Sequence, residues 1–298
     1  MKILLTGGTS KLGIRVQDFA ERSGFDITSI NLIPPYRSMR LDIRDKDKVG
    51  EFVAKLEPDY IVHLAALSSA DVCETDRDNC HRTNVFAIRN LAEACSLIGG
   101  RMISISSDYV FNGDCGPYSE IDQTSPINEY GRAKLEGERI LSRYCPNSVS
   151  IRSCVLYDWE TRSRRENFLV WLIRKLEKNE QVTIVNDQYS TPTFIPQLAE
   201  VILDLLKNEY RGVIHVSGSE YISRYDFSLE ASKIFGLDKS LIKENDSTGF
   251  IQSALRPLKG GLKVERVEKL LEKEMLSCSK GLELCRQIKD GSIESFNG

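Results

Sequence analysis

The first half of the chain alternates short apolar runs with segments whose apolar residues recur at helical spacing. Runs typical of strands lie at 2–6, 25–32, 60–64, 102–106 and 148–157, and helical spacing occurs at 11–23, 45–56, 79–98 and 130–144. Because the runs are nearly continuous, the strands should be covered on both faces. The alternation predicts an α/β fold with a doubly wound parallel sheet, whose ligands bind outside the carboxyl ends of the strands.

The second half has a less regular pattern. Helical spacing occurs at 168–178, 196–207, 224–235 and 264–274, with a short strand at 213–216 and a charged loop at 158–167. We expect these later segments to form a smaller lobe that closes over the edge of the sheet.

The composition narrows the class of protein. The chain has 298 residues, with 40 Lys and Arg against 43 Asp and Glu, and 41% of its residues are hydrophobic. This near-neutral balance gives no attraction to nucleic acid or to an anionic membrane. The longest apolar runs are far below the ~20 residues of a membrane span, and no signal peptide is evident. We therefore expect a cytoplasmic protein with neither nucleic-acid nor membrane partners.

The cysteines and histidines give no metal pattern. There are eight cysteines without a CxxC pair, and only three histidines. We expect reduced thiols and no metal site, although Cys278 and Cys285 could pair in an oxidising compartment.

A glycine turn at residues 6–13 joins the first strand to the first helix. Backbone N–H groups and the positive end of the helix dipole would meet a phosphate there. Gly7 suits the tight turn and Gly13 suits close packing of the helix on the strand, while Ser10 replaces the usual middle glycine. Glycine turns often only connect elements, but this position after the first strand favours a dinucleotide.

The end of the second strand bears on the choice of cofactor. No acid accompanies Asn31, although an acid usually holds the ribose of NAD there, and Arg37 and Arg40 follow. This favours the 2′-phosphate of NADPH, with NAD as the alternative if the arginines are merely solvated. Asp42 and Ile43 would bracket the adenine.

Three side chains suit acid–base chemistry at a carbonyl. Tyr130 and Lys134 lie four residues apart and share one helix face. A tyrosine is a poor acid–base catalyst near neutral pH unless a cation favours its phenolate. Ser107 ends the fourth strand, where a hydroxyl can polarise a carbonyl. The alternative is a surface lysine beside a tyrosine at a helix start, but the combination with the glycine turn favours hydride transfer.

Several further motifs accompany these residues. They are residues 63–66, Asp71, Cys73, Glu74, Asn84, and residues 106–113, 117–120, 187–193 and 256–257. With the glycine turn and residues 130–134, they resemble the extended short-chain dehydrogenase/reductases, and within these the dTDP-4-dehydrorhamnose reductase family. The resemblance covers nearly the whole chain.

The resemblance implies the architecture and the reaction. It implies a Rossmann-type domain over 1–155 and a substrate lobe over 156–298, some of whose segments return to the first domain. It also implies NADPH-dependent or NADH-dependent reduction of the C4 ketone of a nucleotide-activated 4-keto-6-deoxysugar, with dTDP-4-dehydrorhamnose as the leading substrate. A homodimer stays open.

The resemblance also carries residue roles. Ser107, Tyr130 and Lys134 would be catalytic. The cofactor would be bound by Gly7, Thr9, Ser10, Lys11, Leu12, Gly13, Asn31, Arg37, Asp42, Ile43, Leu64, Ala65, Ala66, Asn84, Tyr130 and Lys134. The substrate would be bound by Asp108, Tyr109, Val155, Gln188 and Arg256.

Two other functions share these features. Sugar-nucleotide epimerases and dehydratases use the same three groups but retain and recycle their cofactor. A non-catalytic NADP-binding regulatory subunit, as in methionine adenosyltransferase, resembles the same family.

The chain departs from the family pattern at two positions near the expected sugar site. Val155 stands where the family often has a tryptophan, and Gly260 stands where a serine is usual, so the identity of the sugar stays open.

Overall fold

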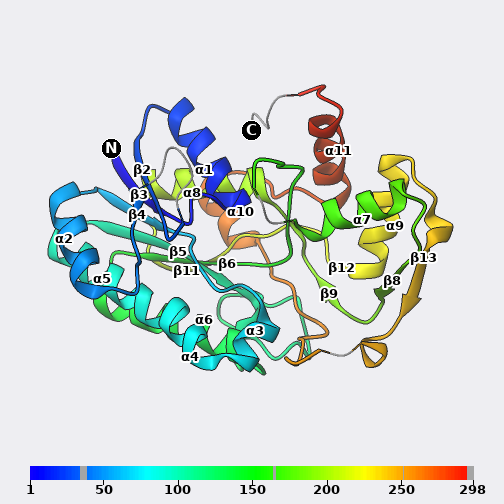
Figure 1. Cartoon of the computed structure of the whole chain (residues 1–298), viewed down its shortest axis with the longest axis horizontal. Helices are drawn as coiled ribbons and strands as arrows, with labels where there is room; N and C mark the ends of the chain where they lie inside the picture. Colours follow the sequence, from blue (N-terminus) through cyan, green and yellow to red (C-terminus); the bar gives the residue numbers. More distant parts are fainter. Residues whose placement is uncertain (34–38, 164–165, 251, 294–298) are drawn as a thin grey trace.

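A seven-stranded sheet in which every strand pair is parallel forms the centre of the molecule. The computed structural model describes residues 1–33, 39–163, 166–250 and 252–293. The strand order is β11-β6-β5-β4-β1-β2-β3 (Figure 1). The strands are β1 (Lys2–Thr6), β2 (Asp26–Asn31), β3 (Met39–Arg40), β4 (Tyr60–His63), β5 (Arg101–Ser107), β6 (Val149–Ser153) and β11 (Gly212–His215). This confirms the predicted doubly wound parallel sheet.

Helices cover both faces of this sheet (Figure 1). One face carries α1 (Lys11–Arg22), α8 (Ile195–Lys207) and α10 (Glu265–Leu271), and the other carries α2 (Lys46–Leu56), α5 (Ala87–Leu97) and α6 (Glu129–Tyr144). The helix starts follow local chemistry, because the side chains of Ser10, Asp45 and Asn128 each accept a hydrogen bond from a backbone N–H three residues later. The order reverses between β1 and β4, and such a switch point is where open α/β sheets bind ligands.

A second lobe lies beside the sheet and has its own core (Figure 1). Its helices are α7 (Phe168–Glu177), α9 (Arg224–Phe235) and α11 (Cys278–Lys289). Its strands are β8 (Val182–Val185), β13 (Ile242–Asn245), β9 (Tyr189–Ser190) and β12 (Ile222–Ser223), and β7 (Leu156–Tyr157) pairs with β10 (Thr193–Phe194).

Several short helical segments complete the described structure. They are the α-helices α3 (Ala70–Thr75) and α4 (Arg77–His81), the π turn η1 (Arg82–Phe86), and the 3₁₀ turns η2 (Asp108–Val110), η3 (Lys239–Leu241) and η4 (Ser247–Gly249).

The structure differs from the sequence pattern in several places, and strands β3, β8 and β13 were not predicted. The long helix predicted at 79–98 is α4, a π turn and α5 in succession. The strand predicted at 148–157 divides into β6 and β7, because Val155 takes a left-handed φ of 43°. Helix α11 was not predicted, since its buried face consists largely of Cys278, Leu282 and Cys285 rather than of large aliphatic residues.

The structure also bears on the state of the cysteines and on whether any helix could span a membrane. All eight cysteines are free thiols, and only Cys115 is exposed. Among the helices of the described residues, none has the length and apolar character needed to cross a membrane.

Candidate active site

The glycine turn after β1 leaves no room for a side chain at Gly7 or at Gly13. Gly7 has a φ of +75°, and a Cβ on it would lie 2.7 Å from the backbone nitrogen of Ala65. A Cβ on Gly13 would lie 2.4 Å from the carbonyl oxygen of Gly7. The hydroxyl of Ser10 closes the turn, because it donates to the Gly7 carbonyl and accepts from the Gly13 N–H. The first turn of α1 therefore opens onto the carboxyl edge of the sheet with bare backbone.

The side chains of the two residues after Ser10 are engaged within the protein. Leu12 is buried in the core between α1 and the sheet. The Nζ of Lys11 donates to the carbonyl of Glu160 in the loop after β7, and burial lowers the pKa of this lysine. Of the residues expected at the cofactor, these two have their side chains engaged within the protein.

The end of β2 holds Asn31, whose amide oxygen has partners but whose amide nitrogen has none among the described residues. The Oδ1 of Asn31 accepts from the backbone N–H and the hydroxyl of Thr9, at 3.3 and 3.2 Å. The Nδ2 of Asn31 is buried without a hydrogen-bond partner among the described residues. Buried donors of this kind are rare, and they indicate a group that joins later, such as a bound ligand.

The remaining residues expected at the adenosine lie close by. Ile43 is buried, and both carboxylate oxygens of Asp42 accept from the Arg44 guanidinium, which lowers the pKa of Asp42. Arg40 is exposed on β3, whereas Arg37 lies outside the described residues.

The segment after β4 is held against the glycine turn. Leu64, Ala65 and Ala66 are partly exposed there, and the Ala65 N–H donates to the Thr6 hydroxyl at 3.2 Å. The side chain of Asn84, in the π turn, accepts from the Leu67 N–H and donates to the Leu67 carbonyl, both at 2.9 Å. Asn84 therefore fixes the path of this segment, and π turns commonly occur at functional sites.

Ser107, Tyr130 and Lys134 meet where β5 ends beside α6. The side chain of Ser107 lies near enough to the Tyr130 hydroxyl for a hydrogen-bonding interaction that acts to lower the pKa of Tyr130. The Nζ of Lys134 lies 5.7 Å from the centre of the Tyr130 ring and donates to the carbonyl of Ile105 at 2.9 Å. Ser107 and Lys134 are buried. The three groups that the sequence analysis selected are thus brought together in space.

Burial shifts the pKa values of two of these groups in opposite directions. It raises the pKa of Tyr130 well above its usual range, although the interaction with Ser107 opposes this shift. Burial lowers the pKa of Lys134 to about 8. At neutral pH the phenol therefore keeps its proton and the lysine is mostly charged.

A buried ion pair between Arg152 and Glu138 supports this arrangement. The sequence analysis did not predict it. Arg152 on β6 donates to both carboxylate oxygens of Glu138, at 2.9 and 2.7 Å, and the hydroxyl of Ser106 donates to Glu138 at 2.5 Å. Glu138 lies one helical turn after Lys134, so the spacing 130, 134, 138 on α6 was the available signal.

Asp108 and Tyr109 continue the site from Ser107 toward the second lobe. The carboxylate of Asp108 is buried and accepts from the Ser107 hydroxyl at 3.1 Å and from the Gly261 N–H at 3.4 Å. Burial raises the pKa of Asp108 to about 6. The ring of Tyr109 meets that of Tyr130 edge-on, with 5.6 Å between centres.

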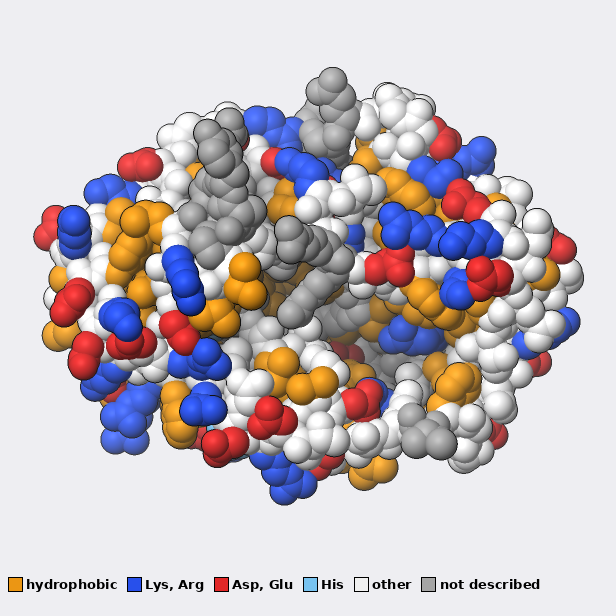
Figure 2. Space-filling view, viewed as in Figure 1, with side chains coloured by type: hydrophobic (Ala, Val, Ile, Leu, Met, Phe, Trp, Pro, Cys, Tyr) orange, Lys and Arg blue, Asp and Glu red, His pale blue; other side chains and the backbone are white. Residues whose placement is uncertain are grey.

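The other residues expected at the substrate come from the second half of the chain. The Nε2 of Gln188 is buried without a hydrogen-bond partner in the described part of the chain. Arg256 forms an ion pair with Asp71 and donates to the Ala254 carbonyl at 2.9 Å. Val155 occupies the bend between β6 and β7. Figure 2 shows the surface hollowed between the sheet domain and the lobe that carries α7 and α9.

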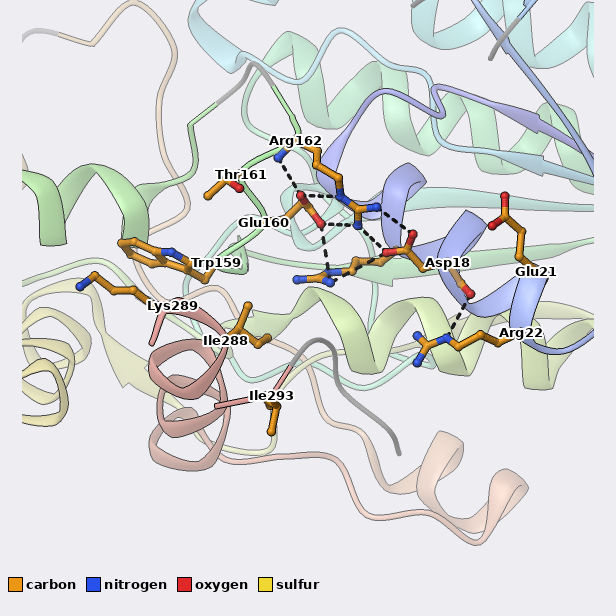
Figure 3. Close-up of a pocket in the computed structure, with 11 residues that line it drawn as sticks. Asp18, Glu21, Arg22, Trp159, Glu160, Thr161, Arg162, Ile288, Lys289 and Ile293 are labelled. Carbon is orange, nitrogen blue, oxygen red and sulfur yellow. Dashed lines mark hydrogen bonds and ion pairs between the residues drawn. The ribbon is translucent and has the colours of Figure 1, made fainter. Parts of the chain in front are cut away.

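A separate polar pocket lies between α1, the loop after β7 and α11 (Figure 3). It has a volume of about 930 Å³, and its charges are largely paired with one another. The guanidinium of Arg15 lies 2.7 Å from Asp158, and Arg162 binds Asp18 and Glu160. The residues that line it include neither the glycine turn nor Ser107, Tyr130 or Lys134. We interpret it as an ion-pair network that fastens the loop to α1.

The comparisons with known proteins agree with this geometry. The chain is 29% identical to dTDP-4-dehydrorhamnose reductase of Escherichia coli (strain K12), over 90% of this chain and 91% of that protein. It is 30% identical to methionine adenosyltransferase 2 subunit beta of Danio rerio, over 90% and 84%. The structure of dTDP-4-dehydrorhamnose reductase from Bacillus anthracis str. Ames in complex with NADP matches with a TM-score of 0.89 and 27% identity, over 96% of this chain and 98% of that one. The family model described as RmlD substrate binding domain matches residues 1–288, and the chain belongs to this family.

Proposed function

We propose that the protein reduces the C4 ketone of a nucleotide-activated 4-keto-6-deoxysugar, with dTDP-4-dehydrorhamnose as the leading substrate and NADPH as the preferred cofactor. The observation that carries the proposal is the meeting of Ser107, Tyr130 and Lys134 at the end of β5. The names of the Escherichia coli relative and of the NADP-bound structure support the substrate and the cofactor.

The carboxyl edge of the sheet fits a dinucleotide. The bare backbone of Gly7 and Gly13 at the start of α1 suits its diphosphate, and the unpaired amide of Asn31 suits a polar group of its adenosine half. Residues 64–66 and Asn84 would form the wall beside it. NADPH, when bound there, supplies the hydride.

The protein's own groups handle the ketone oxygen. Ser107 and Tyr130 would hold that oxygen by hydrogen bonds, and Tyr130 would donate its proton as the alkoxide forms. Burial raises the pKa of Tyr130, which keeps the proton on the phenol at neutral pH but makes it a weaker acid than the sequence analysis expected. The charge of Lys134 would stabilise the resulting phenolate, and Glu138 would hold the strand and helix in place.

A regulatory subunit is the second candidate, and one specific finding favours it. The protein of Danio rerio at 30% identity is named as a subunit of methionine adenosyltransferase. Under this alternative the chain would bind a dinucleotide and a partner enzyme without ketone-dependent oxidation of NADPH. An epimerase or dehydratase would instead retain its NAD through purification.

The decisive variant is Tyr130→Phe, assayed for NADPH oxidation with dTDP-4-dehydrorhamnose. We expect kcat to fall by roughly 10²-fold or more, because the proton donor is lost, while the affinity for NADPH is unchanged. Tyr144→Phe serves as the matched control, since this tyrosine ends α6 far from the site and contacts Arg89 and Arg143. Turnover that survives Tyr130→Phe with normal substrate binding contradicts the proposal.

A further inference from the structure

Arg224 opens helix α9 on the wall of the second lobe. Its backbone N–H donates to the carbonyl of Gln188 at 2.9 Å. Its guanidinium carbon lies 4.7 Å from the centre of the Phe168 ring, at the start of α7. The side chain therefore rests on a neutral surface where three segments of the lobe meet.

Within the described part of the chain, the positive charge of this guanidinium is not balanced by an ion pair. Among the described residues, no carboxylate forms an ion pair with Arg224, and its side chain makes no hydrogen bond. The groups that act on its charge are Tyr109, Arg256 and Asp108, and burial lowers its pKa. Holding a partly buried cation without a counter-ion is costly, and an anion that joins later would account for its presence.

The neighbouring charges do not supply that anion. The carboxylate of Asp108 already accepts from the Ser107 hydroxyl and the Gly261 N–H. Asp71 is bound to Arg256 and to the Ala254 N–H. Arg256, the expected diphosphate ligand, is thus neutralised within the protein, whereas Arg224 is not.

Two buried donors on segments that adjoin Arg224 in the chain or through its backbone also lack partners among the described residues. They are the Nε2 of Gln188, whose backbone contacts Arg224, and the hydroxyl of Tyr221, three residues earlier in the chain. Unpaired buried polar atoms are uncommon, and here they gather on the segments that carry the free cation. The wall therefore offers positive charge and spare hydrogen-bond donors together.

We propose that Arg224 binds the diphosphate of the nucleotide-sugar substrate and so determines the specificity for diphosphate-linked sugars. This inference rests on the proposed function and adds to it a residue that the sequence analysis did not select. Asp108 and Tyr109 continue directly from Ser107, so the anion would lie on the far side of these residues from the reacting ketone. A guanidinium can hold two phosphate oxygens at once, which a lysine cannot do.

The test compares the binding of dTDP, UDP and GDP by calorimetry in the wild type, Arg224→Gln and Arg224→Lys. We expect the nucleotide that binds most tightly to bind roughly 10- to 100-fold more weakly to Arg224→Gln, with an intermediate loss in Arg224→Lys. The matching nucleoside should bind equally to all three proteins. Arg174→Gln, which removes an exposed cation of the same lobe, is the control and should bind as the wild type does.

The outcomes separate this inference from the proposed function. Wild-type affinity in Arg224→Gln overturns the inference, and so does an equal loss for the nucleoside or a wild type that binds none of the three nucleotides. Arg224-dependent binding without ketone reduction supports the inference and contradicts the proposed reductase. Reduction with an unchanged KM in Arg224→Gln leaves the reductase standing and rejects the role of Arg224.

Discussion

At the scale of single residues, the proposed chemistry depends on the pKa values of Tyr130 and Lys134, which burial moves in opposite directions. The pKa of Tyr130 rises and that of Lys134 falls to about 8. Because one group must keep its proton and the other its charge, both conditions are met only below pH ~8. The side chains alone thus define a working pH range.

This range gives a testable pH dependence. The lowered pKa of Lys134 means that its charge is lost as the pH rises through about 8, so kcat/KM should fall there. Lys134→Arg keeps its charge at alkaline pH and should lose this limb of the profile, although kcat will be lower. The measurement is kcat/KM across neutral and alkaline pH for both proteins. The same alkaline limb in Lys134→Arg would assign it to another group.

Asp108 gives a second prediction, on stability. Burial raises its pKa from 3.8 to about 6, so folding disfavours its ionised form. The cost is absent below pH ~4, grows as the pH rises through about 6, and reaches at most about 3 kcal/mol. Asp108→Asn should therefore gain stability relative to the wild type as the pH rises over this range. Urea unfolding at several pH values tests this, and a difference that does not vary with pH would refute it.

The sequence analysis selected the three residues that we propose to react, but not the residues around them. Tyr130 and Lys134 share a helix face and Ser107 ends a strand, so local spacing and the known edge of a parallel sheet were enough. Glu138 follows Lys134 at helical spacing on α6, but its partner Arg152 and the residue Arg224 lie on distant segments without a motif, and their contacts depend on packing. The pairing of Arg256 with Asp71 likewise joins residues far apart in the chain.

At the scale of elements, the first strand–turn–helix unit allows a matched pair of substitutions. Gly13→Ala would place a Cβ 2.4 Å from the Gly7 carbonyl, and neither backbone segment can move freely. We expect a loss of about 1–3 kcal/mol in the free energy of unfolding and weaker NADPH binding.

Gly50→Ala is the control, because it lies inside α2 with nothing within 4 Å of its Cβ position. This change should stabilise the protein by about 0.5–1 kcal/mol. Urea unfolding and NADPH titration measure both variants. Equal stability of Gly13→Ala and the wild type would show that the close packing of α1 on the turn is not required.

The apolar runs of the first half predicted its longer strands. The sequence pattern did not predict where a helix or strand is interrupted. The π turn at Asn84 and the bend at Val155 are set by tertiary contacts that local pattern does not encode. Helix α11 escaped prediction because cysteines and a glycine form much of its buried face. Periodicity of large aliphatic residues was the only signal available for such helices.

At the scale of the whole molecule, the second half of the chain supplies a strand and helices to the domain that the first half begins. Strand β11 pairs with β6, and α8 packs on α1 within the same core. We propose 1–155 as the main cofactor domain and 156–298 as the main substrate lobe, with β11, α8 and α10 belonging to the sheet domain.

This arrangement predicts that residues 1–155 do not fold alone. Without α8 and β11, one face of α1 and the edge of β6 would be exposed to water. A chain of residues 1–155 should unfold without a cooperative transition and should not bind NADPH. Cooperative urea unfolding of this fragment with NADPH bound would contradict the prediction, and the whole chain is the control.

The proposed reaction transfers a hydride from a dissociable cofactor to a sugar ketone. The most direct measurement uses NADPH that carries deuterium in both C4 positions of the nicotinamide, with dTDP-4-dehydrorhamnose as substrate and mass spectrometry of the product. The account predicts one deuterium at C4 of the sugar for each NADPH oxidised, with the rate lost in Tyr130→Phe. A product without deuterium, or no product from a folded protein that binds NADPH, would contradict it.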